Sequence, residues 1–266
     1  MNDTFEIKRL SRLIKYELIN YMPKFFKSLL IFASVIVAVW IFSLTADIPV
    51  MPSGRVDLVR TLFVLAIILS PFIVYKNMNN RKKGYIYAMI PASTLEKLLS
   101  MIVLCVVVVP VLSYAVLTAT DLLLWLFNKI GAGSFCEMAF YNPFADTMAY
   151  SLYFDDESGC LLPFFDGLLY IVHPVSYTIM FNTIFRKNKV MKTILFNIAV
   201  VFTLVILALM NSGLFEEICR NIAPYFDSMT PVKYLGWMFV VSRCATVLLT
   251  TTFLTITYFR IKKVNY

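Results

Sequence analysis

The sequence predicts an all-α, polytopic membrane protein with six transmembrane helices, and two observations lead to this fold class. The first is that six long apolar stretches run through the 266 residues. Each is close to the ~20 residues that a helix needs to cross a hydrocarbon core of ~30 Å, and each is apolar all round, as a lipid-exposed helix must be. The predicted spans are 25–46, 58–75, 98–120, 162–185, 193–212 and 235–259.

The second observation is that the connecting segments alternate in charge. Most of the 24 Lys and Arg residues lie before the first span, between spans two and three, between spans four and five, and after span six. The other connections are mainly acidic. Because positively charged loops stay in the cytoplasm, we expect both termini and the second and fourth loops on that side.

Composition agrees with a membrane protein and argues against a nucleic-acid partner. The mean hydropathy is +0.77 and 60% of the residues are apolar, against ~45–50% in soluble domains. The net charge of +8 is explained by bases that flank the spans and meet anionic lipid headgroups. The first apolar stretch starts late and lacks a small-residue cleavage site, so it is expected to be a retained anchor.

The segment before the first span has the periodicity of an amphipathic helix. Apolar residues recur at helical spacing, and bases fall on another face. The apolar set is Ile7, Leu10, Ile14, Leu18 and Tyr21, and the basic set is Lys8, Arg12 and Lys15. This pattern predicts an interfacial helix on the cytoplasmic membrane surface that bends at Pro23 into the first span. The alternative is a basic flank that only sets the topology.

The loop between spans two and three, residues 77–97, contains a helix-start signal. Ser93 and Glu96 have the S-x-x-E spacing of a capping box. A helix is therefore expected to begin at about Thr94 and to continue into span three, separated by Pro91 from what precedes it. The alternative is an ordinary loop.

The two longest outer segments are too short for a second domain, so residues 1–266 are expected to form one transmembrane domain. Segment 127–161 is rich in aromatic residues, which suit a belt at headgroup level. The residues of segment 213–234 predict a short amphipathic helix that ends at Pro224. Pro231 then begins the stretch that leads into span six.

Few residues suggest catalysis or a cofactor. The chain has no G-x-x-x-x-G-K-[ST] phosphate loop, no G-x-S-x-G elbow, and a single His with no Cys or His partner at metal-binding spacing. We therefore expect no cofactor, no metal and no enzyme activity in this chain by itself.

Four polar residues fall within or near the apolar stretches. His173 precedes Pro174 inside span four; this pair is either a hinge facing a pathway or a histidine hydrogen-bonded within the bundle. Arg243 lies inside span six, where a cation is costly. We expect it to pair with Asp121 or Asp166 near the outer face.

The cysteines fall into two groups. Cys105 and Cys244 lie within spans and are expected to act as small apolar residues. Cys136, Cys160 and Cys219 are expected outside the membrane, where an oxidising compartment would permit a disulfide; a Cys136–Cys160 bond would lie within the third outer segment.

The layout resembles the membrane subunit of a type-2 ABC exporter. The amphipathic helix at 4–22, the loop at 77–97 and the outer hairpin at 214–234 match the family's architecture along the whole chain. The run from Ile90 to Lys97, I-P-A-S-T-L-E-K, is similar to the "L-P-x-S-x-x-E" passage often seen in such permeases before span three. The loop between spans three and four is longer than the family's pattern.

The resemblance implies partners and a cellular location. A separate ABC ATPase subunit would dock on the second loop, and a second permease copy or homologue would complete the pathway in a bacterial plasma membrane. The residues expected to contact the ATPase are Arg81, Lys82, Lys83, Tyr85, Tyr87, Met89, Ser93, Leu95 and Glu96.

Two other functions stay open on the sequence alone. One is a non-transporting accessory or sensor subunit of a membrane complex. The other is an intramembrane enzyme acting on lipid, for which His173, Asp166 and Arg243 are the available polar residues. If the chain transports, its apolar spans fit a lipid-like, peptide or amphipathic cargo better than a small hydrophilic solute.

Overall fold

The structure is a computed structural model that describes residues 5–46, 52–78, 87, 89–131, 161–210 and 231–263. In these ranges every regular element is a helix. The helices are α1 (Ile7–Ala46), α2 (Pro52–Val74), α4 (Thr94–Ile102), the π-helical turn η1 (Val103–Val108), α5 (Val109–Gly131), α7 (Leu161–Ile184), α8 (Lys189–Met210) and α10 (Pro231–Lys263). The predicted all-α class is confirmed for the described part of the chain.

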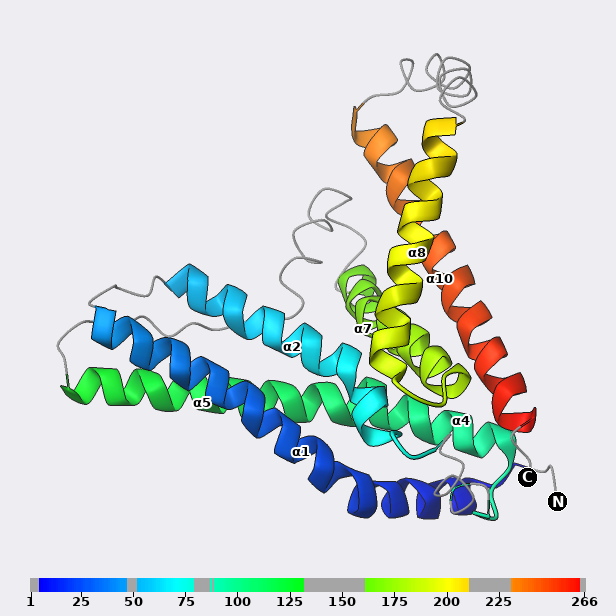
Figure 1. The fold of residues 1–266 in the computed structure, drawn as a ribbon, viewed down its shortest axis with the longest axis horizontal. Coiled ribbons are helices and arrows are strands. Elements are labelled where there is room, and N and C mark those ends of the chain that lie inside the picture. The colour runs from blue at the N-terminus through cyan, green and yellow to red at the C-terminus, as the bar shows by residue number, and fades with distance from the viewer. Residues whose placement is uncertain are drawn as a thin grey trace.

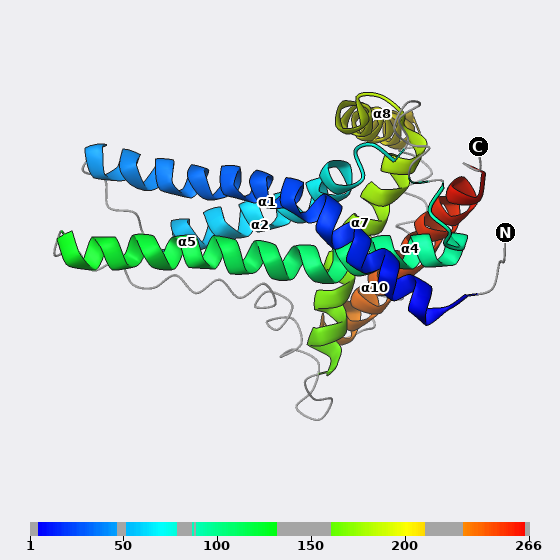
Figure 2. The same ribbon diagram turned by 90° about the horizontal axis from the view of Figure 1, so that it is seen from below.

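The helices form two groups that diverge from a shared end (Figures 1 and 2). α1, α2 and α5 pack side by side in one group, and α7 and α10 pack together in the other. α7 joins the groups because it also packs against α2. At the shared end α4 packs against both α1 and α10, so the start of the first helix and the end of the last lie near each other.

α1 is one helix with two chemically different halves. Its first half, to Lys27, carries all of its charges, because no charged residue occurs from Ser28 to Ala46. The helix changes direction along its length (Figures 1 and 2) and contains Pro23, whose missing N–H and bulky ring permit a kink. The charged half is thus a separate arm that precedes the uncharged, membrane-length half.

The capping-box prediction for the second loop is confirmed. α4 begins at Thr94, the Ser93 side chain accepts a hydrogen bond from the Glu96 amide, and Glu96 in return accepts one from the Ser93 amide. The π-helical turn that follows was not predicted. Pro110 has no N–H to donate to the Val106 carbonyl, and just before it the Val109 amide reaches five residues back to Leu104.

All six predicted spans fall largely within helices. Five segments of the described chain are long and apolar enough to cross a membrane: Ile7–Ser43, Val56–Val74, Thr94–Phe127, Lys189–Leu207 and Val240–Lys263. These helices are those of a membrane-embedded protein. α7 has sufficient length, 24 residues, but it is not one of these five segments, so the sixth span stays a prediction.

The buried polar residues of α7 have a packing explanation. Ser176, Thr178, Asn182 and Thr183 are all buried, because α7 lies between α2 and α10 rather than at the periphery. A helix enclosed by others can satisfy strongly polar side chains, such as the Asn182 amide, more readily than a lipid-facing helix can. α8 is the opposite case, since it contacts mainly α7 and exposes most of its apolar side chains, as expected for a face turned to lipid or to another subunit.

Candidate functional site

A single buried carboxylate, that of Glu96, holds the N-termini of two helices. Its Oε2 accepts the Ser93 amide at 2.8 Å, at the start of α4. Its Oε1 accepts the Glu6 amide at 2.8 Å, immediately before α1, and lies 3.4 Å from the Arg9 guanidinium. Negative charge is favourable at both helix N-termini. Glu96 therefore fastens the charged arm of α1 to the start of α4.

These contacts also account for the charge state of Glu96, which is fully buried. Burial disfavours the carboxylate, but the hydrogen bonds from the Glu6 and Ser93 amides, together with the Arg9 charge, outweigh it and lower the pKa of Glu96. The carboxylate consequently stays ionised at neutral pH.

Glu17 forms a second buried contact on the charged arm. Its Oε2 accepts the Tyr75 hydroxyl at 2.9 Å, which joins the arm to the end of α2. The Tyr75 ring contacts Tyr21 and Tyr87 edge-on. Desolvation by burial raises the pKa of Glu17 to about 7, and no ion pair of Glu17 within the described residues offsets it.

The second-loop residues divide into internal and exposed sets. Tyr87, Ser93 and Glu96 are buried and contact the chain itself, and Lys97 lies 5.5 Å from the Tyr87 ring centroid. Met89 is 76% exposed and Leu95 46%. Among the described residues that were predicted to contact the ATPase, Met89 and Leu95 therefore expose apolar side chains to a partner, while Tyr87 has an internal position that the sequence did not predict.

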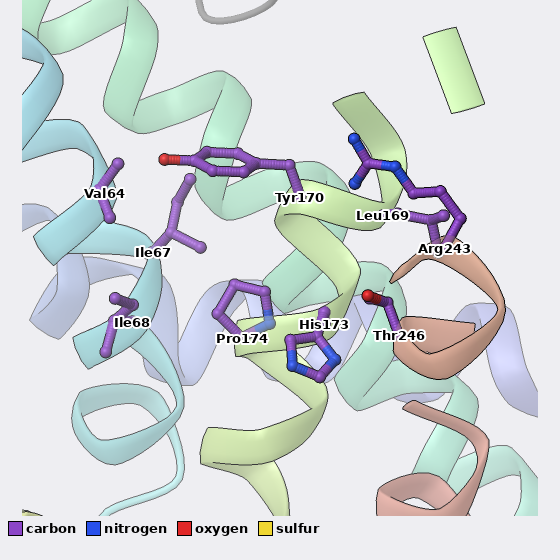
Figure 3. Close-up of a pocket in the computed structure, with 9 residues that line it drawn as sticks. All are labelled: Val64, Ile67, Ile68, Leu169, Tyr170, His173, Pro174, Arg243 and Thr246. Carbon is purple, nitrogen blue, oxygen red and sulfur yellow. The ribbon is translucent and has the colours of Figure 1, made fainter. Parts of the chain in front are cut away.

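A second feature is a cavity of about 340 Å³ between α2, α7 and α10. Its walls are mostly apolar, with Val64, Ile67 and Ile68 from α2 facing Tyr170 and Pro174 of α7 (Figure 3). We call it the His173 pocket. It lies where the two helix groups meet, so any change in their relative position alters its shape.

Two of the predicted intramembrane polar residues, His173 and Arg243, line the His173 pocket. The Nδ1 atom of His173 lies 3.0 Å from the Thr250 hydroxyl of α10, which agrees with a histidine hydrogen-bonded within the bundle. The Arg243 side chain extends from α10 towards α7 (Figure 3). The pocket thus combines a large apolar surface with one cation.

The expected pairing of Arg243 stays a prediction. Asp121 is buried on α5, which packs against α1 and α2, whereas α10 packs against α7. Asp166 lies on α7, the helix that Arg243 approaches, but its side chain is outside the described residues. Of the two candidates, Asp166 is on the helix that α10 contacts.

Several other predicted residues fall outside the described part of the chain. They are Arg81, Lys82, Lys83 and Tyr85 of the second loop, Cys136 and Cys160 of the proposed disulfide, and most of the outer hairpin at 214–234. Of the two cysteines in the described helices, Cys105 is buried as an apolar residue would be, and Cys244 is exposed.

A polar joint that was not predicted from the sequence connects α2, α7 and α8. The Asn182 amide nitrogen donates to the Pro71 carbonyl at 2.8 Å. The Lys189 ammonium donates to the Asn182 side-chain oxygen at 2.5 Å and to the Tyr75 carbonyl at 3.3 Å. The only available sequence signal was Asn182, a strongly polar residue inside an apolar stretch.

Comparison with known protein families, curated proteins and solved structures finds no match to this chain.

Proposed function

We propose that this chain is the membrane subunit of an ATP-driven exporter of the type-2 ABC kind, coupled to a separate ATPase through the second loop. The observation that carries the proposal is the Glu96 contact, which fastens the start of span three to the charged arm that precedes span one. A loop that transmits force must be rigid and must be connected to more than one span. Glu96 provides both properties.

The proposed force would pass through these contacts. A push on exposed Met89 and Leu95 moves the start of α4, and Glu96 transfers the movement to α1. Glu17 transfers it to α2 through the Tyr75 hydroxyl. Spans one to three would then move as one body relative to α7, α8 and α10, with the Asn182 joint acting as the pivot.

The His173 pocket suits this mechanism as a cargo contact. It lies between the two bodies, and its apolar walls with Arg243 favour an amphipathic molecule that carries a negative charge. Movement of α2 against α7 would change the access to it. A second copy of the chain or a homologue would complete the pathway, and the exposed apolar faces of α8 and α10 offer surfaces for that partner or for lipid. The expected location is a bacterial plasma membrane.

The test is purification of the tagged chain from its native host in a mild detergent, with mass-spectrometric identification of copurifying proteins. A stoichiometric protein with a phosphate-binding loop is the expected result. Met89→Glu and Leu95→Glu should each abolish its copurification, since both place a charge on the apolar contact surface.

Met191→Glu is the matched control, because Met191 is also a strongly exposed methionine, at 64%, in the first turn of α8. The amount of ATPase that copurifies with the Met191→Glu variant should equal the amount that copurifies with the wild type. If the well-folded wild type brings down no ATPase, the exporter assignment fails and an accessory or sensor subunit becomes the better interpretation.

A further inference from the structure

A second, larger cavity of about 720 Å³ lies where α2 ends and α8 begins. It is distinct from the His173 pocket and faces the shared end of the two helix groups. Five basic side chains line it, from three parts of the chain: Lys24, Lys76, Arg186, Lys187 and Lys189. We refer to it as the basic cavity.

The charge of the basic cavity is not balanced by acids within the described chain. No Asp or Glu lines it, and the ion pairs found among the described residues involve Arg9 instead. Lys189 is buried and hydrogen-bonded to neutral oxygens of Asn182 and Tyr75. The other four bases are exposed. Several like charges around one cavity repel each other, and an anion would relieve that repulsion.

The remaining wall of the basic cavity is apolar. Leu69, Phe72 and Ile73 of α2 and Val190 of α8 contribute to it. The bases also flank apolar helices, because Lys24 precedes the uncharged half of α1, Lys76 follows α2, and residues 186–189 lead into α8. The cavity therefore has a cationic side and an apolar side, at the height where the membrane-length segments begin.

We propose that the basic cavity binds an anionic phospholipid, with the phosphate among the basic side chains and an acyl chain along the apolar wall of α2. Basic pockets between helices on the cytoplasmic side suit such headgroups. A soluble phosphate would use only the cationic side and would leave the apolar wall without a partner. This site does not depend on the exporter function.

The experiment uses the full chain purified in a neutral detergent. Native mass spectrometry and thermal unfolding would compare phosphatidylglycerol with phosphatidylcholine and with soluble glycerol phosphate. The test variant is Lys76→Gln/Arg186→Gln, which removes two exposed charges from the cavity. The control is Lys262→Gln/Lys263→Gln, which removes the same charge from the last turn of α10.

We expect the wild type to retain phosphatidylglycerol in preference to phosphatidylcholine and to be stabilised by it. Affinity should fall by about tenfold or more in the test variant, and it should be unchanged in the control. Equal losses in the two variants would mean general surface attraction and would overturn the site.

Three further results would also contradict the proposal. They are equal binding of phosphatidylcholine, equal stabilisation by soluble glycerol phosphate, and unchanged lipid binding with loss of a copurifying protein in the test variant. The last result would assign the basic cavity to a protein partner. Circular dichroism of each variant establishes that it folds before binding is compared.

Discussion

Replacement of Glu96 by alanine should release the charged arm of α1 from the start of α4. The substitution removes the carboxylate that accepts both the Glu6 and the Ser93 amides. A hydrogen bond to a charged group contributes about 1.5–3 kcal/mol, and about 1.4 kcal/mol corresponds to a factor of ten. The exchange rate of the Glu6 amide should therefore rise by roughly tenfold to a hundredfold.

Hydrogen exchange measured by mass spectrometry on the detergent-purified chain is the appropriate assay, because it reports on the arm separately from the rest of the protein. The increase should extend through the first turn of α1, where the Leu10 amide donates to the Glu6 carbonyl. The uncharged half of α1, beyond Ser28, should not change.

Ser93→Ala is the matched control. It removes the Ser93 hydroxyl, which accepts the Glu96 amide at 3.3 Å, but leaves both bonds of the Glu96 carboxylate in place. It should weaken only the start of α4, by about 1 kcal/mol. If Glu96→Ala leaves exchange at Glu6 unchanged, or if Ser93→Ala increases it equally, the carboxylate does not connect the two helices and the proposed force path is wrong.

Three other predictions concern Glu17, the Asn182 joint and Arg243. Burial raises the pKa of Glu17 to about 7 from an ordinary value of 4.5, so the folded state binds a proton more tightly than the unfolded state. Protonation of Glu17 therefore adds about 3 kcal/mol to the free energy of unfolding. This contribution is complete below pH 4.5 and is lost as the pH rises through 7. Thermal unfolding between pH 5 and 8 should show this loss in the wild type, and Glu17→Gln should remove it. Asn182→Leu leaves the buried Lys189 without its closest acceptor and should lower the free energy of unfolding by about 2–3 kcal/mol. Asn20→Leu is the control, because Asn20 is exposed and donates to the Tyr16 carbonyl of its own helix; it should change the free energy of unfolding by less than about 1 kcal/mol, and comparable losses would count against the joint. Arg243→Met should weaken binding of an anionic amphipathic fluorophore but not of its neutral analogue. Equal effects on both would show that the Arg243 charge does not contribute to binding.

The helices were predictable because each follows from a local pattern. The apolar stretches and the capping box depend on residues close together in the chain, and α4 begins at the predicted Thr94. The sequence did not predict that Glu17 would lie buried on the inner side of the arm. The arm packs against α4, so protein contacts replace part of the expected lipid contact.

The polar contacts between helices were not predictable from one sequence, since their partners lie far apart. Tyr75 and Glu17 are 58 residues apart, and Asn182 and Pro71 are separated by 111. Neither residue of such a pair indicates its partner through spacing. Single polar residues in apolar surroundings, such as His173, did identify positions of interest, but only the packing of α7 between α2 and α10 explains why they are tolerated there.

The wide turn at Val103–Val108 acts as a rotational offset in the third span. A π-turn holds one residue more than an α-turn, and successive α-helical residues are rotated by about 100°. α4 and α5 can therefore face different neighbours although they form one continuous rod. Deletion of a single residue from this turn would turn the start of α4, with Glu96 and Leu95, about 100° away from the charged arm, without altering the length or hydropathy of the span appreciably. The orientation of the second loop is thus encoded some ten residues away from it, at a point where a one-residue insertion or deletion during evolution would redirect the loop towards a different partner.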